Sequence, residues 1–148
     1  MTAAKAYVAG PFRGRSHWEI AQNIRAAETI ALACWRLGLA TYCPHSSTAH
    51  FQGDAPDQVW LHGHIAWLDV ADVVVLVPRG WEESHGTAAE IARAQSRGIP
   101  VFLPLSVSDR PDSLGLARPL GDGGVCLASW LRGRAVRALD ALDVGGEE

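Results

Sequence analysis

A carboxylate near the start of an expected helix is the group in this sequence best placed to attack an electrophile. Glu90 ends the segment 84–90, Ser-His-Gly-Thr-Ala-Ala-Glu, which follows a buried apolar run and leads into a helical pattern. One interpretation is structural, because Thr87 and Glu90 have the spacing of a capping box, in which each side chain satisfies a free N–H group. The other is chemical: a helix N-terminus favours an ionised carboxylate, and such a group can attack an anomeric carbon. The segment alone is compatible with both.

Two turns that follow expected strands have residues suited to binding a phosphate or a sugar. Arg13 offers a fork of donors, and the backbone N–H groups of a glycine-containing turn add to it. The candidates are Gly10, Pro11, Phe12, Arg13 and Gly14 in the first turn and Ser84, Gly86 and Thr87 in the second. Glycine also occurs in such turns for steric reasons alone, so neither turn is specific by itself.

These segments lie within an alternating pattern of strands and helices. Apolar runs predict strands at 5–9, 40–43, 73–77 and 100–105, and three- and four-residue spacing predicts helices at 18–37, 57–71, 87–97 and 128–142. The alternation predicts a flavodoxin-like or Rossmann-like three-layer α/β sandwich with a mostly parallel sheet of about five strands. Ligands bind such sheets outside the carboxyl ends of the strands, where the loops 10–16, 44–57 and 78–86 should meet. Residues 106–124 are expected to form a flap or an interface loop.

Length and charge limit the classes of function. The 148 residues suit one domain, residues 1–148, with its core at about 5–105. A net charge of −3 and a pI near 6.0 give no basic footprint for a nucleic-acid polymer. The longest apolar run is too short to cross a membrane and the N-terminus does not read as a signal peptide, so we expect a cytoplasmic protein.

Histidine and cysteine patterns give no support for a metal or a redox cofactor. The pair His62 and His64 is two residues apart, whereas helical ligands on one face are three or four apart, and the loop pair His45 and His50 has no defined third ligand. We therefore expect neither a metal nor another cofactor. Cys34, Cys43 and Cys126 have no CxxC pairing, and they are expected to be reduced and buried.

Aromatic residues are frequent near the expected crevice. Trp60, Trp81 and Phe51 lie in or beside its loops, where an aromatic face could stack on a nucleobase or simply pack against the protein. Trp35 and Trp67 lie on apolar helical stripes, so they are expected in the core.

Four segments, in chain order, resemble the nucleoside 2-deoxyribosyltransferase superfamily. They are Tyr7-Val8-Ala9-Gly10-Pro11-Phe12, Trp67-Leu68-x-x-Ala71-Asp72-Val73-Val74-Val75, Ser84-x-Gly86-Thr87-x-x-Glu90-Ile91-x-x-Ala94 and Gly98-Ile99-Pro100-Val101. The superfamily includes deoxynucleoside 5′-monophosphate N-glycosidases and cytidylate hydrolases. The resemblance spans about residues 5–105 and favours the chemical interpretation of Glu90. It implies cleavage or exchange of the base–sugar bond in a small nucleoside or nucleotide.

The resemblance also implies roles for individual residues. Glu90 becomes the nucleophile that forms a glycosyl-enzyme intermediate, and Tyr7 places a hydroxyl beside it. Transferases of this kind tend to have Asp six residues before the nucleophile, whereas the monophosphate glycosidases have Ser, so Ser84 together with Arg13 points to a 5′-monophosphate. Relatives complete the site across a subunit interface, which implies a homodimer or a higher homo-oligomer.

One position departs from the family pattern. His64 stands where relatives have an Asp that handles the proton of the base. Histidine can do such acid–base work, since its ordinary pKa of about 6.5 is near neutral. Alternatively, His64 is only a polar helix residue, and Asp57, Asp69, His62 or water handles the proton. Two other functions therefore stay open, a non-catalytic nucleotide-binding or sensing module and a ribonucleotide phosphoribohydrolase.

Overall fold

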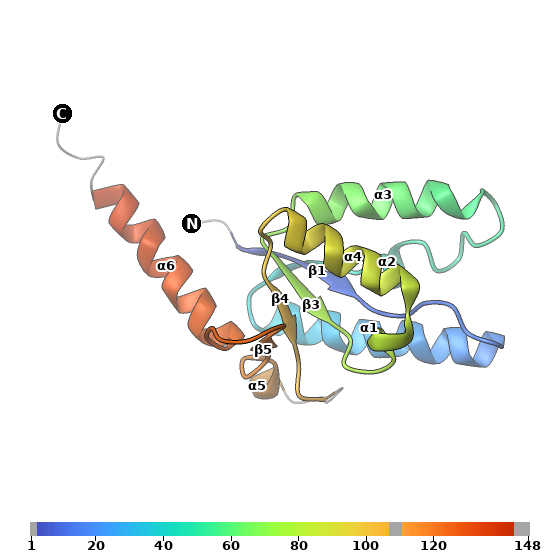
Figure 1. Ribbon diagram of the computed structural model, residues 1–148, viewed down its shortest axis with the longest axis horizontal. Coiled ribbons are helices and arrows are strands. Elements are labelled where there is room, and N and C mark those ends of the chain that lie inside the picture. Colours follow the sequence, from blue (N-terminus) through green and yellow to red (C-terminus); the bar gives the residue numbers. More distant parts are fainter. Residues whose placement is uncertain (1–2, 107–110, 144–148) are drawn as a thin grey trace.

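The computed structural model describes residues 3–106 and 111–143 as one five-stranded sheet with helices on both faces (Figure 1). In chain order the elements are β1 (Lys5–Ala9), α1 (His17–Arg36), β2 (Ala40–Tyr42), α2 (Pro44–Ser47), α3 (Asp57–Asp69), β3 (Val73–Leu76), the 3₁₀ turn η1 (Trp81–Glu83), α4 (His85–Ser96), β4 (Val101–Leu103), α5 (Pro111–Leu114), β5 (Arg118–Pro119) and α6 (Leu127–Asp143). None of the helices in these ranges is long and apolar enough to span a membrane.

The strands follow the order β2-β1-β3-β4-β5, and all neighbours are parallel except β4 and β5. The chain order reverses at β1, since β2 lies on one side of it and β3 on the other. In sheets of this kind the crevice at the reversal point is where ligands bind. The structure confirms the flavodoxin-like, mostly parallel α/β fold.

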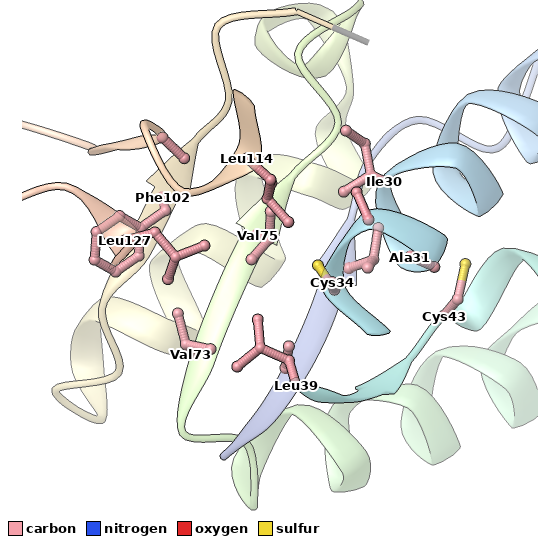
Figure 2. Close-up of a cluster of buried hydrophobic side chains, with 14 of the residues drawn as sticks. Ile30, Ala31, Cys34, Leu39, Cys43, Val73, Val75, Phe102, Leu114 and Leu127 are labelled. Carbon is pink, nitrogen blue, oxygen red and sulfur yellow. The ribbon is translucent and has the colours of Figure 1, made fainter. Parts of the chain in front are cut away.

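Alternate residues of the strands face two separate cores. Val73 and Val75 of β3 face a cluster formed with α1, α5 and the start of α6, which also holds Phe102 and Leu127 (Figure 2). The intervening Val74 belongs to the opposite cluster, under α3 and α4. Residues buried on both faces explain why the central strand is apolar throughout. Tyr7 of β1 faces the α3/α4 side, which is the side of Glu90.

Helix α1 fixes the path of the turn that precedes it. The hydroxyl of Ser16 accepts a hydrogen bond from the backbone N–H of Glu19, an N-cap that satisfies one of the free donors of the first turn. The carboxylate of Glu19 in turn accepts from the backbone N–H of Arg15. The helix ends before Gly38, whose φ of 91° favours glycine.

Three expectations for the fold were wrong in detail. Of the expected loop 106–124, residues 107–110 lie outside the described residues, and the rest is not only a loop, because α5 and the antiparallel strand β5 lie within it and β5 extends the sheet. The loop after β2 begins with the short helix α2, for which Pro44 supplies the first residue. Trp35 and Trp67 are 56% and 54% exposed rather than in the core. The helices form the outer layers of the fold, so the side chains that face away from the sheet are in contact with solvent.

Candidate functional site

A cleft of about 770 Å³ lies at the carboxyl ends of β1 and β3. All three expected loops contribute to its wall, as the alternation of strands and helices predicted. The candidate residues on the wall are Tyr7, Gly10, Pro11, Phe12, Arg13, Trp60, His64, Ser84, Gly86, Thr87 and Glu90. Gly14, Phe51 and Trp81 are not on the wall. The cleft therefore collects most of the candidate site residues in one place.

Glu90 and Tyr7 form a hydrogen-bonded pair inside this cleft. Tyr7 is 1% exposed and extends from β1, while Glu90 extends from α4. Burial raises the pKa of Glu90 to about 7, although the hydrogen bond from the Tyr7 hydroxyl acts in the opposite direction. The pKa of Tyr7 is raised by its burial and by the neighbouring carboxylate, so Tyr7 stays a neutral donor. The pKa of Glu90 therefore lies near neutral pH, well above that of an ordinary glutamate.

The capping-box interpretation of Thr87 and Glu90 is wrong, and so is the expectation that a helix end keeps Glu90 ionised. Helix α4 begins one turn earlier, with Ser84 as its N-cap. The Ser84 hydroxyl accepts from the backbone N–H of Thr87 at 3.2 Å and from its hydroxyl at 2.9 Å. Glu90 is thus the sixth residue of the helix, beyond the first turn to which the dipole effect is confined. Burial determines its pKa instead.

The turn after β1 approaches its neighbours closely at two glycines. A Cβ atom at Gly10 would lie 2.5 Å from Cγ2 of Val77, and one at Gly14 would lie 2.5 Å from Cβ of Glu19. Asn23 of α1 donates from its side-chain amide to the carbonyls of Phe12 and Arg13. The backbone of this turn is therefore held from both sides, and its path requires glycine at both positions.

Replacing Gly10 with alanine is expected to destabilise the protein by about 1–3 kcal/mol, the usual cost of forcing extra volume into a packed interior. Val77 is buried and branched at Cβ, so it has little room to move away from the added methyl group. The free energy of unfolding in urea measures the effect. Gly63→Ala in α3 is the matched control, because a Cβ there has no neighbour within 4 Å. A Gly10→Ala protein as stable as the wild type would contradict the close approach.

Arg13 crosses the mouth of the cleft to a partner that the sequence did not indicate. Its guanidinium forms an ion pair with the carboxylate of Asp57, the first residue of α3. Both side chains are more than half exposed, so the pair contributes little to stability. An anion that enters the cleft can replace Asp57 at Arg13 at small cost.

His45 was considered only as an unlikely metal ligand, yet it is a central residue of the wall. It is 4% exposed, and its Nε2 lies 3.0 Å from the carbonyl oxygens of both Gly10 and Pro11. Both partners are acceptors, so Nε2 has the proton and donates. Burial lowers the pKa of His45, which keeps the ring neutral, and its Nδ1 has no hydrogen-bond partner among the described residues. The sequence could have indicated this position, because His45 follows the carboxyl end of β2 and ligands bind such sheets outside the carboxyl ends of the strands.

His64 points from α3 toward β2 and α2. Its Nδ1 lies 3.1 Å from the Tyr42 hydroxyl, and its Nε2 lies 3.4 Å from the hydroxyl of Thr48. Burial, and to a lesser extent the nearby His45, lowers the pKa of His64. A neutral imidazole is therefore the favoured form at neutral pH, and both of its nitrogens have protein partners.

Among the aromatic candidates, only Trp60 lies on the wall of the cleft. Phe51 packs against it with ring centroids 6.1 Å apart and is half exposed. Trp81 packs against the α3/α4 core cluster. The indole N–H of Trp60 is buried without a partner in the described part of the chain. Of these three residues, Trp60 is therefore the one placed to stack on a base in the cleft.

Other charged groups and cysteines serve the scaffold. Asp69, one of the alternative proton carriers, accepts two hydrogen bonds of 2.8 Å from Arg93. Asp72 accepts from the backbone N–H of Lys5. Cys34 and Cys43 are buried as expected, but Cys126 is partly exposed, contrary to expectation. Within residues 3–106 and 111–143, no three histidine, cysteine or acidic side chains are arranged to hold a metal ion.

Comparison with solved structures gives relatives of the same fold. A 2-deoxyribosyltransferase from the psychrotolerant bacterium Bacillus psychrosaccharolyticus is 18% identical, with a TM-score of 0.54 over 68% of this chain and 71% of the other. A conserved protein from Enterococcus faecalis V583 is 24% identical, with a TM-score of 0.51 over 69% of this chain and 63% of the other. No curated protein matches. The model of a domain of unknown function, DUF7768, matches residues 4–103, and the chain therefore belongs to that family.

Proposed function

We propose that this protein cleaves or exchanges the N-glycosidic bond of a nucleoside 5′-monophosphate or a nucleoside, with Glu90 as the nucleophile. The observation that carries the proposal is the Tyr7–Glu90 pair in the cleft at the reversal point of the sheet. A carboxylate whose pKa lies near neutral and whose charge is tuned by burial is characteristic of catalytic sites. The solved 2-deoxyribosyltransferase of the same fold supports a nucleoside as the ligand.

The chemistry follows in two steps. An ionised Glu90 oxygen forms a bond to the anomeric carbon while the carbon–nitrogen bond breaks, and the base leaves with the electron pair. Water, or the nitrogen of a second base, then attacks the same carbon and releases Glu90. Water gives a hydrolase, and a second base gives a transferase. The Tyr7 hydroxyl donates to the carboxylate and holds it in position.

The leaving base needs a proton, and His64 is a weak candidate for supplying it. A ring with a lowered pKa, held by Tyr42 and Thr48, is mostly neutral at neutral pH. The same observation supports the alternative of a nucleotide-binding or sensing module without turnover. A base that can leave as an anion, or that is protonated from water, would not need His64.

Base release distinguishes the two functions. The protein is incubated with purine and pyrimidine nucleosides and their 5′-monophosphates, in ribo and deoxyribo forms, and the free base is quantified. Release from any of them supports the enzyme, and the ribo/deoxyribo ratio separates a ribonucleotide phosphoribohydrolase from a deoxyribosyl enzyme. Ligand binding by calorimetry without release of base from any substrate would show the binding module instead.

Replacing Arg13 with alanine is expected to weaken the binding of 5′-monophosphates by about ten- to a hundredfold and the binding of nucleosides hardly at all, since a charge-assisted hydrogen bond contributes roughly 1.5–3 kcal/mol. Arg13 and Arg79 both line the cleft, and the guanidinium of Arg13 is paired with Asp57, a carboxylate that a 5′-phosphate would replace. Dissociation constants for a matched nucleoside and monophosphate measure the difference. Arg15→Ala, which removes an exposed guanidinium paired with Glu19 instead, is the control. Equal weakening of both ligands would exclude a phosphate contact.

We propose small-molecule nucleosides or nucleotides as the ligands, no resident cofactor, and no nucleic-acid polymer or membrane as a partner. Association into a homodimer or a higher homo-oligomer and a cytoplasmic location are further parts of the proposal. The association follows from the family resemblance, and the location follows from the composition of the chain. Sedimentation of the purified protein tests the association.

A further inference from the structure

Arg79 is a residue of the cleft wall to which neither the family resemblance nor the proposed chemistry gives a role. It lies in the turn after β3, outside the four segments on which the resemblance rests. Its side chain is exposed, and it has no hydrogen-bond or ion-pair partner among residues 3–106 and 111–143. Exposed arginines are common on protein surfaces, so its position and the charges around it decide whether it binds a ligand.

The backbone on both sides of Arg79 is fixed by its neighbours. Strands β1 and β3 stay paired up to their carboxyl ends, so the turns that follow them leave the sheet side by side. Pro78 restricts the chain before Arg79, and Gly80 after it has a φ of 72°, which favours glycine. A Cβ atom at Gly80 would lie 3.4 Å from Cγ of Pro11, so this turn contacts the turn that leads to Arg13. The two arginines therefore start from adjacent turns at one edge of the sheet.

The charges on the cleft wall make Arg79 the cation that is available to an anionic ligand. Besides histidines, the charged side chains on the wall are Arg13, Asp57, Arg79, Glu83 and Glu90. Asp57 pairs with Arg13 and offsets its charge. Neither Glu83 nor an ionised Glu90 has a cationic partner in the described part of the chain. Without Arg79 this wall would repel a phosphate monoester, whose charge at neutral pH is about −1.5 to −2.

We infer that Arg79 binds the 5′-phosphate of the ligand and makes the cleft select nucleoside monophosphates over nucleosides. The ligand is the nucleotide of the proposed function, on which this inference rests. The planar fork of a guanidinium can donate to two oxygens of one phosphate. Arg13 must give up Asp57 to reach the phosphate, whereas Arg79 gives up only water. Arg79 should therefore contribute at least as much to the affinity as Arg13 does.

Ribose 5-phosphate and ribose test this contact without requiring a particular base, and neither can be turned over by base release. Ligand-observed NMR measures their affinities. Arg79→Ala is expected to weaken the binding of ribose 5-phosphate by at least about tenfold and that of ribose hardly at all. Arg79→Lys keeps the charge but lacks the fork, so it is expected to recover part of the affinity.

Arg36→Ala is the matched control, and it is expected to bind both sugars like the wild type. Arg36 is also exposed and without an ion-pair partner among the described residues, but it ends α1, just before the amino end of β2. In a parallel sheet that end lies opposite the cleft. Circular dichroism of each variant confirms that it folds.

The possible results separate this inference from the proposed function. Unchanged binding of ribose 5-phosphate by Arg79→Ala overturns the inference, and so does an equal loss for both sugars or a wild type that binds neither. Inorganic phosphate is measured in parallel. If it binds through Arg79 but ribose 5-phosphate does not, the site takes a free anion and the inference is wrong. If ribose 5-phosphate binds through Arg79 and no nucleotide releases its base, the phosphate contact stands and the proposed enzyme activity fails.

Discussion

The Glu90→Gln protein is expected to lose base release by about 10³-fold or more, in line with removal of a nucleophile in other covalent mechanisms. Glutamine keeps the size of the side chain and its hydrogen bond with Tyr7, but it lacks the anionic oxygen that bonds to the sugar. Ligand binding is expected to change only a few-fold. Single-turnover assays and calorimetry measure the two quantities. An active Glu90→Gln protein would exclude Glu90 as the nucleophile.

The same substitution is expected to increase the free energy of unfolding at alkaline pH. The pKa of Glu90 is raised to about 7 in the folded protein, whereas the unfolded chain has an ordinary value near 4.5. The folded state thus holds its proton more tightly, and ionisation reduces stability as the pH rises from about 4.5 to 7. The full loss is about 3–4 kcal/mol by proton linkage. Glutamine does not ionise, so the variant avoids this loss.

Urea unfolding at pH 5 and at pH 8.5 measures the linkage. The free energy of unfolding of Glu90→Gln should exceed that of the wild type by about 3–4 kcal/mol at pH 8.5 and by much less at pH 5. Glu82→Gln is the control, because Glu82 is an exposed glutamate just before α4. An equal difference at the two pH values would mean that the carboxylate is ionised throughout. A gain in stability that accompanies loss of function is typical of groups kept for catalysis.

The fold was predictable because each central strand is a short run buried on both faces. Val73–Leu76 is apolar throughout and lies between two helical patterns, which predicts a central strand buried on both faces. The antiparallel strand β5 was not predictable, since Arg118 and Pro119 have no strand pattern and are held by pairing with Leu103 and Phe102 of β4. An edge strand of this kind forms because of tertiary contacts, and the local sequence does not predict these contacts.

The site was predictable in its location but not in its electrostatics. Parallel strands bring their carboxyl ends together, which places Tyr7 and Glu90 in one cleft. Whether the helix end acts on Glu90 depends on which residue caps α4, because only the first turn is within its reach. Thr87 and Ser84 are both good N-cap residues, and only the structure shows that Ser84 caps the helix and that Thr87 is fully buried. Trp67 was misplaced because its apolar stripe faces outward.

Replacing His45 is expected to disturb the turn after β1, residues 10–16, more than any other substitution considered. Its Nε2–H group donates to two backbone carbonyls, those of Gly10 and Pro11, and so directs the turn that leads to Arg13. His45→Ala leaves both carbonyls without their donor and creates a cavity, at a cost of about 2–4 kcal/mol. Affinity for 5′-monophosphates should fall together with stability, because the path of the turn is no longer fixed.

His45→Gln separates the hydrogen bond from the packing. The amide nitrogen of glutamine can occupy nearly the position of the imidazole Nε2, so this variant should recover about half of the stability and most of the affinity. Urea unfolding and calorimetry with one monophosphate measure both. If alanine and glutamine prove equally harmful, the ring itself, packed 6.1 Å from Phe12, matters more than its donor. Recovery by glutamine would instead show that the carbonyls of the turn need a donor on α2, because glutamine supplies an N–H group but no aromatic ring.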